Sequence, residues 1–332
     1  MVRISAFGVV LALVVAAAVA ALTSSHDASA RSNGSTISLV AYSTPRDAYS
    51  QLIPAFQKTQ AGQGVSFQQS YGASGEQARA VIAGLKADVV EFSLEPDMTS
   101  LVKAGFVAKS WKKEAFRGIV TRSVVVFVVR KGNPKHIRTW NDLIKPGVDV
   151  LVPNVQTSGG AKWDVIAAYG AQRKLGKSHA QSVKYLDKLY GHVVSQDKSA
   201  REALQTFLAG RGDVLLSYEN DAIFAQKHNQ PVDFVMPKST IQIANPIAVV
   251  KSSSNKPAAR AFVNFLRTKQ AQVIWAQNGY RPVVKSASKG FSFPYPPGVF
   301  SIQWLGGWDK VDRRFFDPNT GIVTRIQKRH GS

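Results

Sequence analysis

Hydrophobic and polar residues follow two alternating periods along the chain. Short runs such as 37–42 and 87–94 are apolar or alternate in the manner of β-strands. The segments that follow them, 46–56 and 97–104, repeat apolar residues at helical spacing. Strands and helices that alternate in this way predict parallel βαβ units, and therefore an α/β fold whose sheets are flanked by helices.

Four of the predicted strand-to-helix turns share a capping sequence. In each, a serine or threonine precedes the first helical residues, where its hydroxyl can accept a free backbone N–H. Three of them also have Asp, Gln or Glu three residues later, which completes the spacing of a capping box. The four turns lie at Ser43/Thr44, Ser74/Gly75, Ser158/Gly159/Gly160 and Ser199/Ala200.

These turns are also candidates for binding an anion. The first N–H groups of a helix have no acceptor within the helix, and that end carries partial positive charge. In open α/β sheets such turns gather at the carboxyl edge, where ligands bind. A single capped helix is ordinary, but four converging turns could hold a dianion without a buried lysine or arginine. The acidic residues Asp47, Glu76 and Glu202 are expected to serve the caps.

The charge balance favours anionic ligands but does not choose among them. The chain has 42 Lys+Arg against 21 Asp+Glu, a formal net charge of +21. Such a charge suits small anions, nucleic acid or an anionic membrane surface equally. The basic residues are scattered, except in residues 325–330, which we expect to be a solvated end of the chain. A cationic protein that adheres to polyanions remains an alternative.

The N-terminal residues have the pattern of an export signal. Arg3 precedes an apolar run over 6–22, and Ala28-Ser29-Ala30 fits the small-residue cleavage rule. We expect a signal peptide over 1–30 with cleavage near Ala30, although an uncleaved anchor would also fit. The sequence contains no cysteine, which excludes disulfides and a lipidated cysteine among these residues.

Enzyme and metal motifs are poorly matched. Gly72-Ala73-Ser74-Gly75-Glu76 has glutamate where a nucleophile elbow needs its second glycine, and no phosphate-binding loop with its lysine is present. The six histidines show no metal-binding spacing. We therefore expect no catalytic residue, cofactor or metal, while a secreted hydrolase of anionic esters stays open as an alternative.

Several stretches resemble the periplasmic sulfate-binding proteins, the receptors of sulfate/thiosulfate ABC importers. The matching stretches are Tyr71 to Ala78, Val129 to Lys135, Trp140 to Gly147, Thr157 to Ala161 and Gly212 to Leu215. The resemblance implies a two-lobed type II binding-protein fold in which each lobe is a mixed, mainly parallel sheet flanked by helices. Two strands would cross between a first lobe of 31–120 with 250–332 and a second lobe of 121–249.

The resemblance also implies a ligand and its contacts. A monomeric periplasmic receptor would bind sulfate or thiosulfate between the lobes and deliver it to an ABC permease in the inner membrane, with no nucleic acid involved. Molybdate, tungstate and phosphate are the competing ligands. The implied contacts are the amides or hydroxyls of Ser43, Thr44, Ser74, Gly75, Ser158, Gly159, Gly160 and Ala200, with Arg201 in support.

Two positions depart from the family pattern. Tyr218 aligns where the family has a tryptophan whose indole N–H can only donate, whereas a phenol can donate and accept. A site made only of donors rejects hydrogen phosphate at a cost of roughly 1–3 kcal/mol, because the phosphate proton is left without an acceptor. Tyr218 could weaken that rejection. The turn Ser43-Thr44-Pro45 lacks the family's aspartate, so its donor is undetermined.

Overall fold

The computed structural model describes residues 34–331, which form one compact unit. Its strands are β1 (Thr36–Tyr42), β2 (Ser66–Gly72), β3 (Val89–Glu91), β4 (Ile119–Arg130), β5 (Val150–Leu151), β6 (Val193–Ser195), β7 (Val214–Tyr218), β8 (Val232–Val235), β9 (Gln242–Val249) and β10 (Arg281–Pro282). Its α-helices are α1 (Arg46–Gln57), α2 (Ser74–Ile82), α3 (Glu95–Lys103), α4 (Gly159–Lys174), α5 (His179–Tyr190), α6 (Ala200–Leu208), α7 (Glu219–Lys227), α8 (Lys256–Leu266), α9 (Lys269–Gln277), α10 (Trp308–Val311) and α11 (Ile322–Arg329).

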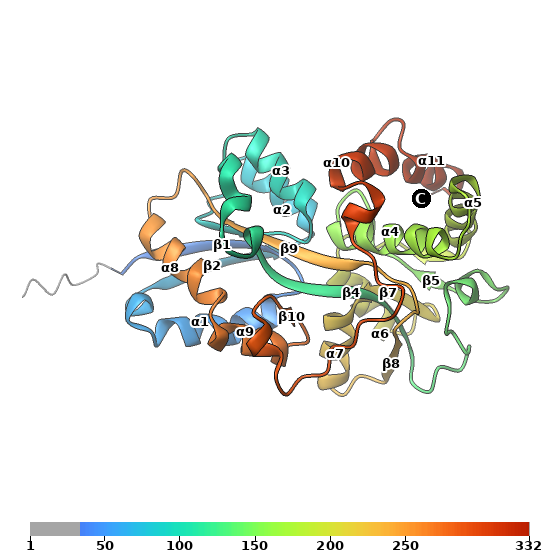
Figure 1. Ribbon diagram of the computed structural model, residues 1–332, viewed down its shortest axis with the longest axis horizontal. Coiled ribbons are helices and arrows are strands. Elements are labelled where there is room, and N and C mark those ends of the chain that lie inside the picture. Colours follow the sequence, from blue (N-terminus) through green and yellow to red (C-terminus); the bar gives the residue numbers. More distant parts are fainter. Residues whose placement is uncertain (1–33, 332) are drawn as a thin grey trace, which may run out of the picture. The chain divides into compact units, whose positions relative to one another are not determined.

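Two long strands, β4 and β9, join two lobes (Figure 1). The sheet order is β2-β1-β3-β9-β4-β7-β5-β6, and β8 and β10 also pair with β4. The parallel pairs lie at the two ends of this order, and each antiparallel pair within the described residues involves β4 or β9. We call the part with β1–β3, α1–α3, α8 and α9 the first lobe, and the part with β5–β8 and α4–α7 the second lobe. The predicted two-lobed α/β fold with two crossing strands is confirmed.

Side chains of β4 alternate between the two faces of the second-lobe sheet. Val125, Phe127 and Val129 belong to the hydrophobic cluster under α4 and α5. Val124, Val126 and Val128 belong to the cluster under α6 and α7. Successive strand residues point to opposite faces, so a strand covered by helices on both sides is apolar throughout. This explains the continuous apolar run that marks β4 in the sequence.

The first lobe is built in the same way. Helices α1, α8 and α9 pack with β1 in one cluster, and α2 and α3 pack with β3 in another. The sheet therefore lies between two helical layers, and the turns after β1, β2 and β3 all open at its carboxyl edge, facing the second lobe.

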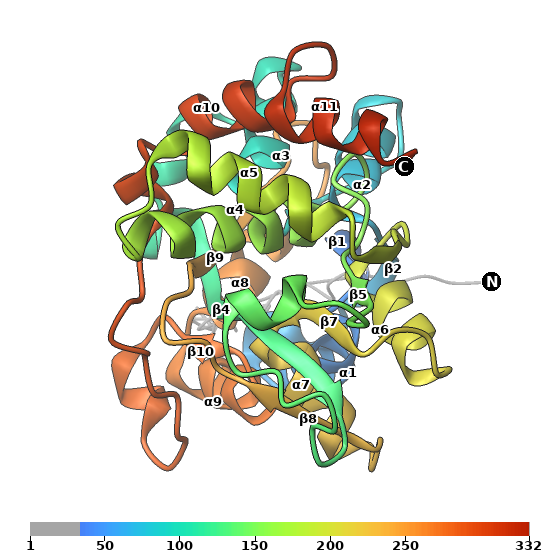
Figure 2. The same cartoon turned by 90° about the vertical axis from the view of Figure 1, so that its right-hand side faces the viewer.

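The C-terminal tail packs with the second lobe. Phe300, Trp308, Phe315 and Ile326 share the hydrophobic cluster of α4 and α5, and Figure 2 shows α10 and α11 covering these helices. The sequence predicts that all of 250–332 belongs to the first lobe, but the part from Phe300 onward packs with the second lobe instead. The expectation of a solvated end over 325–330 holds for its basic residues, since Arg325, Lys328, Arg329 and His330 are exposed. The segment is nevertheless part of the amphipathic helix α11, which buries its apolar face.

The expected signal peptide over 1–30 lies outside the described residues. Among residues 34–331, none of the helices combines the length and apolar character that a membrane span requires.

Candidate functional site

Three of the first lobe's segments and three of the second lobe's meet around one small cavity. The first-lobe lining is Tyr42, Ser43, Thr44, Ala73, Ser74 and Ser93, and the second-lobe lining is Ser158, Gly160, Ser199, Ala200 and Tyr218. This lining contains hydroxyl groups and backbone amides but no lysine, arginine or carboxylate. Such a site can stabilise negative charge only through dipoles and hydrogen bonds.

The two second-lobe helices begin as predicted. Ser158 caps α4 by accepting the Ala161 N–H at 3.3 Å, and Ser199 caps α6 by accepting the Glu202 N–H at 3.2 Å. These caps satisfy the third amide of each helix, while the first two amides have no intrahelical acceptor. Gly160 and Ala200 are among the residues with such free amides, and both line the cavity.

Gly159 is required by the contact between the lobes. A Cβ at this position would lie 2.0 Å from Cδ2 of Leu94 and 2.9 Å from Cβ of Ser93, both in the first lobe. At Gly160 the nearest atoms to a Cβ would be Ser158 Oγ at 3.3 Å and Ala200 Cβ at 3.5 Å. The first glycine therefore permits close approach of the lobes, and the second leaves room beside the cavity.

The turn before α2 differs from the prediction. Its N-cap is Ala73, which makes no side-chain cap, so the predicted cap by Ser74 was wrong. Ser74 Oγ instead donates to Asp97 Oδ2 at 2.5 Å and accepts the Ser93 N–H at 2.9 Å. The Gly75 N–H donates to Thr157 O at 2.9 Å, across to the second lobe. Gly75 therefore contributes to the contact between lobes and its amide is not free for a ligand.

The turn before α1 differs in the same way. The N-cap is Pro45, so the prediction that Thr44 caps this helix was wrong. The Thr44 hydroxyl lies 3.2 Å from Tyr280 Oη, a residue far along the chain. Ser43 and Thr44 still line the cavity, although the predicted cap by Thr44 is absent.

Tyr218 connects the two lobes inside the cavity. Its Oη lies 2.6 Å from Ser93 Oγ, and burial raises the pKa of Tyr218 well above its ordinary value, so the phenol stays protonated. The backbone oxygen of Ser93 accepts from Trp163 Nε1 at 2.9 Å and from Asn245 Nδ2 at 3.0 Å. Ser93 was not predicted as a site residue. Its position just after β3, at the carboxyl edge, was the available signal.

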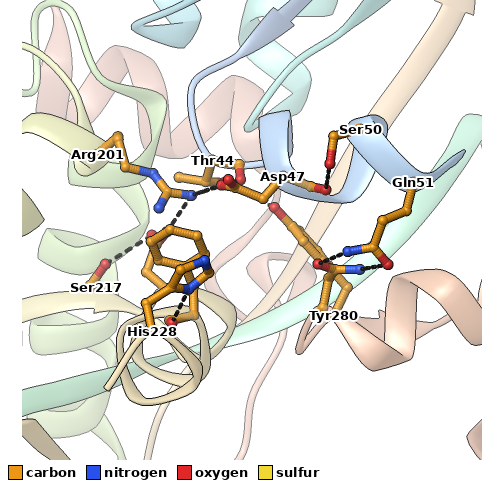
Figure 3. Close-up of polar contacts among 11 residues, drawn as sticks. Thr44, Asp47, Ser50, Gln51, Arg201, Ser217, His228 and Tyr280 are labelled. Atoms are coloured by element: carbon orange, nitrogen blue, oxygen red, sulfur yellow. Dashed lines mark hydrogen bonds and ion pairs between the residues drawn. The ribbon is translucent and has the colours of Figure 1, made fainter. Parts of the chain in front are cut away.

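Arg201 lies beside the cavity and fastens α6 to the first lobe (Figure 3). Its Nη2 donates to Thr44 O at 3.0 Å and to Asp47 Oδ2 at 2.9 Å. Its guanidinium also stacks on Phe224, 3.8 Å from the ring centroid. Burial raises the pKa of Asp221, and Arg201, 3.9 Å away, opposes that shift. Arg201 holds the Thr44 turn in position without lining the cavity.

Metal ligands are not gathered in the described part of the chain. Within residues 34–331, no group of three or more histidine, aspartate or glutamate side chains has an arrangement that could hold a metal ion.

Comparisons with known proteins agree with this geometry. Residues 37–281 match the family model of the bacterial extracellular solute-binding protein. The chain is 40% identical over 303 residues to the sulfate-binding protein of Synechococcus elongatus, covering 88% of this chain and 86% of that protein. It is 37% identical over 305 residues to the sulfate-binding protein of Escherichia coli K12, covering 87% and 92%.

A solved structure is similar as well. The sulfate-binding protein SubI from Mycobacterium tuberculosis H37Rv superposes with a TM-score of 0.83 at 46% sequence identity, covering 85% of this chain and 100% of that one. The chain therefore belongs to the bacterial extracellular solute-binding proteins, in the family of the sulfate-binding proteins.

Proposed function

We propose that this chain is an extracytoplasmic receptor that binds sulfate, or thiosulfate, between its lobes and delivers it to an ABC permease. The main support is the cavity itself, which is lined by hydroxyls and amides from both lobes and by no ionised side chain. Sulfate carries no proton at neutral pH, so a set of donors with fixed dipoles suits it. The relatives named above are sulfate-binding proteins, which agrees with this ligand.

The second lobe supplies most of the proposed donors. Ser158 would donate its hydroxyl, and Gly159, Gly160 and Ala200 would donate their amides from the positive ends of α4 and α6. In the first lobe we propose the amides at Ser43/Thr44 and Ser74 as further donors. Gly75 leaves the proposed set because its N–H already donates to Thr157 O.

The hydroxyl pair of Tyr218 and Ser93 makes the site more tolerant than one made only of donors. One hydroxyl hydrogen is used between the two oxygens, 2.6 Å apart, and the other is free to point at a bound anion. The same oxygens have lone pairs that could accept the proton of hydrogen phosphate. We therefore expect this receptor to bind hydrogen phosphate weakly rather than exclude it.

The remaining features of the receptor are also proposals. Export through the signal over 1–30 would place the protein in the periplasm, as a monomer that carries out no catalysis. We propose that the first lobe spans 31–120 with 250–299, and that the second spans 121–249 together with the tail from Phe300, which shares its hydrophobic cluster.

Calorimetric titration tests this function directly. The chain from residue 31 onward contains the whole compact unit and should release or absorb heat on titration with sodium sulfate, with one site per chain. Absence of heat up to millimolar sulfate would contradict the proposal. A parallel titration with molybdate compares the affinity for this competing ligand with the affinity for sulfate.

A second titration with phosphate isolates the hydroxyl pair. Tyr218→Trp replaces the phenol with a group that can only donate. It should retain sulfate binding and lower phosphate affinity by roughly 5- to 150-fold, the equivalent of about 1–3 kcal/mol. Equal phosphate affinity in both proteins would show that Tyr218 does not affect the discrimination between sulfate and phosphate.

A further inference from the structure

A patch of cations and exposed apolar side chains lies where the end of α4 meets the C-terminal tail. Arg173, Lys310 and Arg314 line one depression together with Trp304. Lys174 Nζ lies 4.4 Å from the centroid of the Trp304 ring. We call these five residues, together with Leu175, which directly follows Lys174 in the sequence, the tail patch. In Figure 2 the turn between α4 and α5 lies beside the dark red segment that precedes α10.

The cations of the tail patch have no acidic partner. Among residues 34–331, Arg173, Lys174, Lys310 and Arg314 make no ion pair, although other surface lysines such as Lys131 do. Burial lowers the pKa of the neighbouring His179, and Arg314 and Arg173 lower it further. The patch is therefore a local concentration of uncompensated positive charge.

Two apolar side chains of the patch are open to solvent. Leu175 is 59% exposed and Trp304 is 47% exposed, and among the other large hydrophobic residues of 34–331 only Tyr295 is as exposed as Trp304. Both stand next to cations. An exposed indole and an aliphatic side chain surrounded by lysine and arginine are typical of surfaces that lie in a membrane interface. There the apolar groups enter the acyl boundary and the cations meet phosphates.

We propose that the tail patch docks on the surface of a bilayer that contains anionic lipids. Trp304 and Leu175 would enter the interface, and Arg173, Lys174, Lys310 and Arg314 would contact headgroup phosphates. A dissolved phosphate would use the cations and leave the two apolar side chains in water, whereas a bilayer satisfies both. Docking would hold an exported receptor close to the membrane without using its ligand cavity, whose lining shares no residue with this patch.

The test is co-sedimentation with lipid vesicles. The chain from residue 31 onward is used, because the apolar segment before it would bind lipid by itself. It should sediment with vesicles of phosphatidylcholine containing about 30% phosphatidylglycerol, and not with phosphatidylcholine alone. Added salt should weaken this binding, because it screens the headgroup charge. Equal binding to both vesicle types would overturn the proposal.

A matched pair of variants separates a docking face from a general effect of net charge. Leu175→Ser with Lys174→Glu changes two exposed neighbours in the tail patch. Leu85→Ser with Lys86→Glu makes the same chemical change at an exposed site after α2, in the first lobe. Each removed cation is worth roughly five-fold in partitioning, so the tail-patch variant should bind vesicles at least about 10-fold more weakly.

The control variant should bind within about three-fold of the unmodified chain, since its site lies outside the patch. Equal losses in both variants, or no loss in the tail-patch variant, would overturn the proposal. Unchanged melting temperatures would show that both variants are folded. Trp304→Ser is a further variant, and its own loss of binding should exceed that of the control.

Discussion

The helix-starting turns of the two lobes look alike in sequence but are held in different ways. In the second lobe, Ser158 and Ser199 cap α4 and α6 with their own side chains. In the first lobe, α1 and α2 have no side-chain cap, and the hydroxyls of Thr44 and Ser74 bond to Tyr280 and Asp97. The same residue types therefore serve local structure in one lobe and distant contacts in the other.

This difference concerns how each half of the cavity keeps its shape. The second lobe fixes its donors within a few residues of each helix end, so they do not depend on the first lobe. The first lobe's turns depend on contacts across the fold, and one of their amides, that of Gly75, donates to the second lobe. We expect the second lobe to be the preformed half of the ligand site, and the first lobe to complete it when the two meet.

The largest expected effect on sulfate affinity comes from a substitution that obstructs the contact between the two lobes. In Gly159→Ala the new methyl group would lie 2.0 Å from Leu94 Cδ2 and 2.9 Å from Ser93 Cβ, so the Leu94 side chain would have to rotate and the turn at Ser93 would have to shift. Overpacking of this kind costs about 3 kcal/mol, or roughly 100-fold in sulfate affinity by calorimetry.

Gly160→Ala is the matched control for this change. Its nearest neighbour would be Ser158 Oγ at 3.3 Å, which requires only a small adjustment. Its loss of affinity should be smaller than that of Gly159→Ala. Because the Gly160 methyl would lie beside the cavity, similar losses in the two variants would show that crowding of the ligand, and not the contact between the lobes, accounts for both.

A smaller effect should distinguish the two serines. Ser158→Ala removes a hydroxyl that we propose donates to the anion, and should weaken sulfate binding by about 1–3 kcal/mol. It should also lower the free energy of unfolding by about 1 kcal/mol, because Ser158 caps α4. Ser74→Ala should mainly lower the free energy of unfolding, by about 1–3 kcal/mol, because the Ser93 N–H and the Asp97 carboxyl lose a partner. Calorimetry and denaturant unfolding measure the two quantities. If Ser74→Ala lost more affinity than Ser158→Ala, the comparison of the lobes would be reversed.

The smallest effect on binding is expected from Glu91, which is buried under the first lobe's turns. Burial raises the pKa of Glu91 from 4.5 to about 8, and a hydrogen bond from Tyr49 opposes the shift. The folded chain then keeps a proton that the unfolded chain releases above pH 4.5. The contribution of Glu91 to the free energy of unfolding is therefore largest below pH 4.5, and it falls by roughly 1.4 kcal/mol per pH unit up to about pH 8.

Glu91→Gln should remove this slope, because an amide does not titrate. Melting temperatures at about pH 5 and about pH 8 measure it. Sulfate affinity should stay the same, since Glu91 does not line the cavity. An unchanged slope in the variant would mean that other groups control the pH dependence. Asp164, which is buried in the second lobe with neither carboxyl oxygen bonded, is the first of those to examine, as Asp164→Asn.

Sequence periodicity was enough to predict the α/β class and most of the strands and helices, and the resemblance to the sulfate-binding proteins supplied the two-lobed arrangement. Periodicity missed α7, because that helix begins directly after Tyr218 with polar residues, Glu219 to Asp221, that are buried in the fold. It also missed α11, whose basic residues concealed the apolar face formed by Ile322, Val323 and Ile326. In both cases tertiary packing decides which residues are buried, and a local pattern does not contain that information.

The candidate site was predictable where local chemistry determines it. The Ser158 and Ser199 caps depend on residues three positions apart, and the sequence indicates them directly. Ser74 and Gly75 form hydrogen bonds to Asp97 and Thr157. These partners are distant in sequence, so no local motif could reveal the hydrogen bonds. Ser93 was missed although its position just after β3 was an available signal, because its partner Tyr218 lies in the other lobe.

The course of β4 has a mechanical consequence. The strand pairs with β9 from Ile119 to Val124, with a register shift between Ile119 and Thr121, and with β7 on its other side from Val125 to Val129. The sheets of both lobes therefore share one continuous strand. Rotation of one lobe against the other must then be absorbed as added twist spread over several peptides rather than by one flexible joint. A joint of this kind has torsional stiffness, and the anion's binding energy would have to do elastic work against it before the receptor could close.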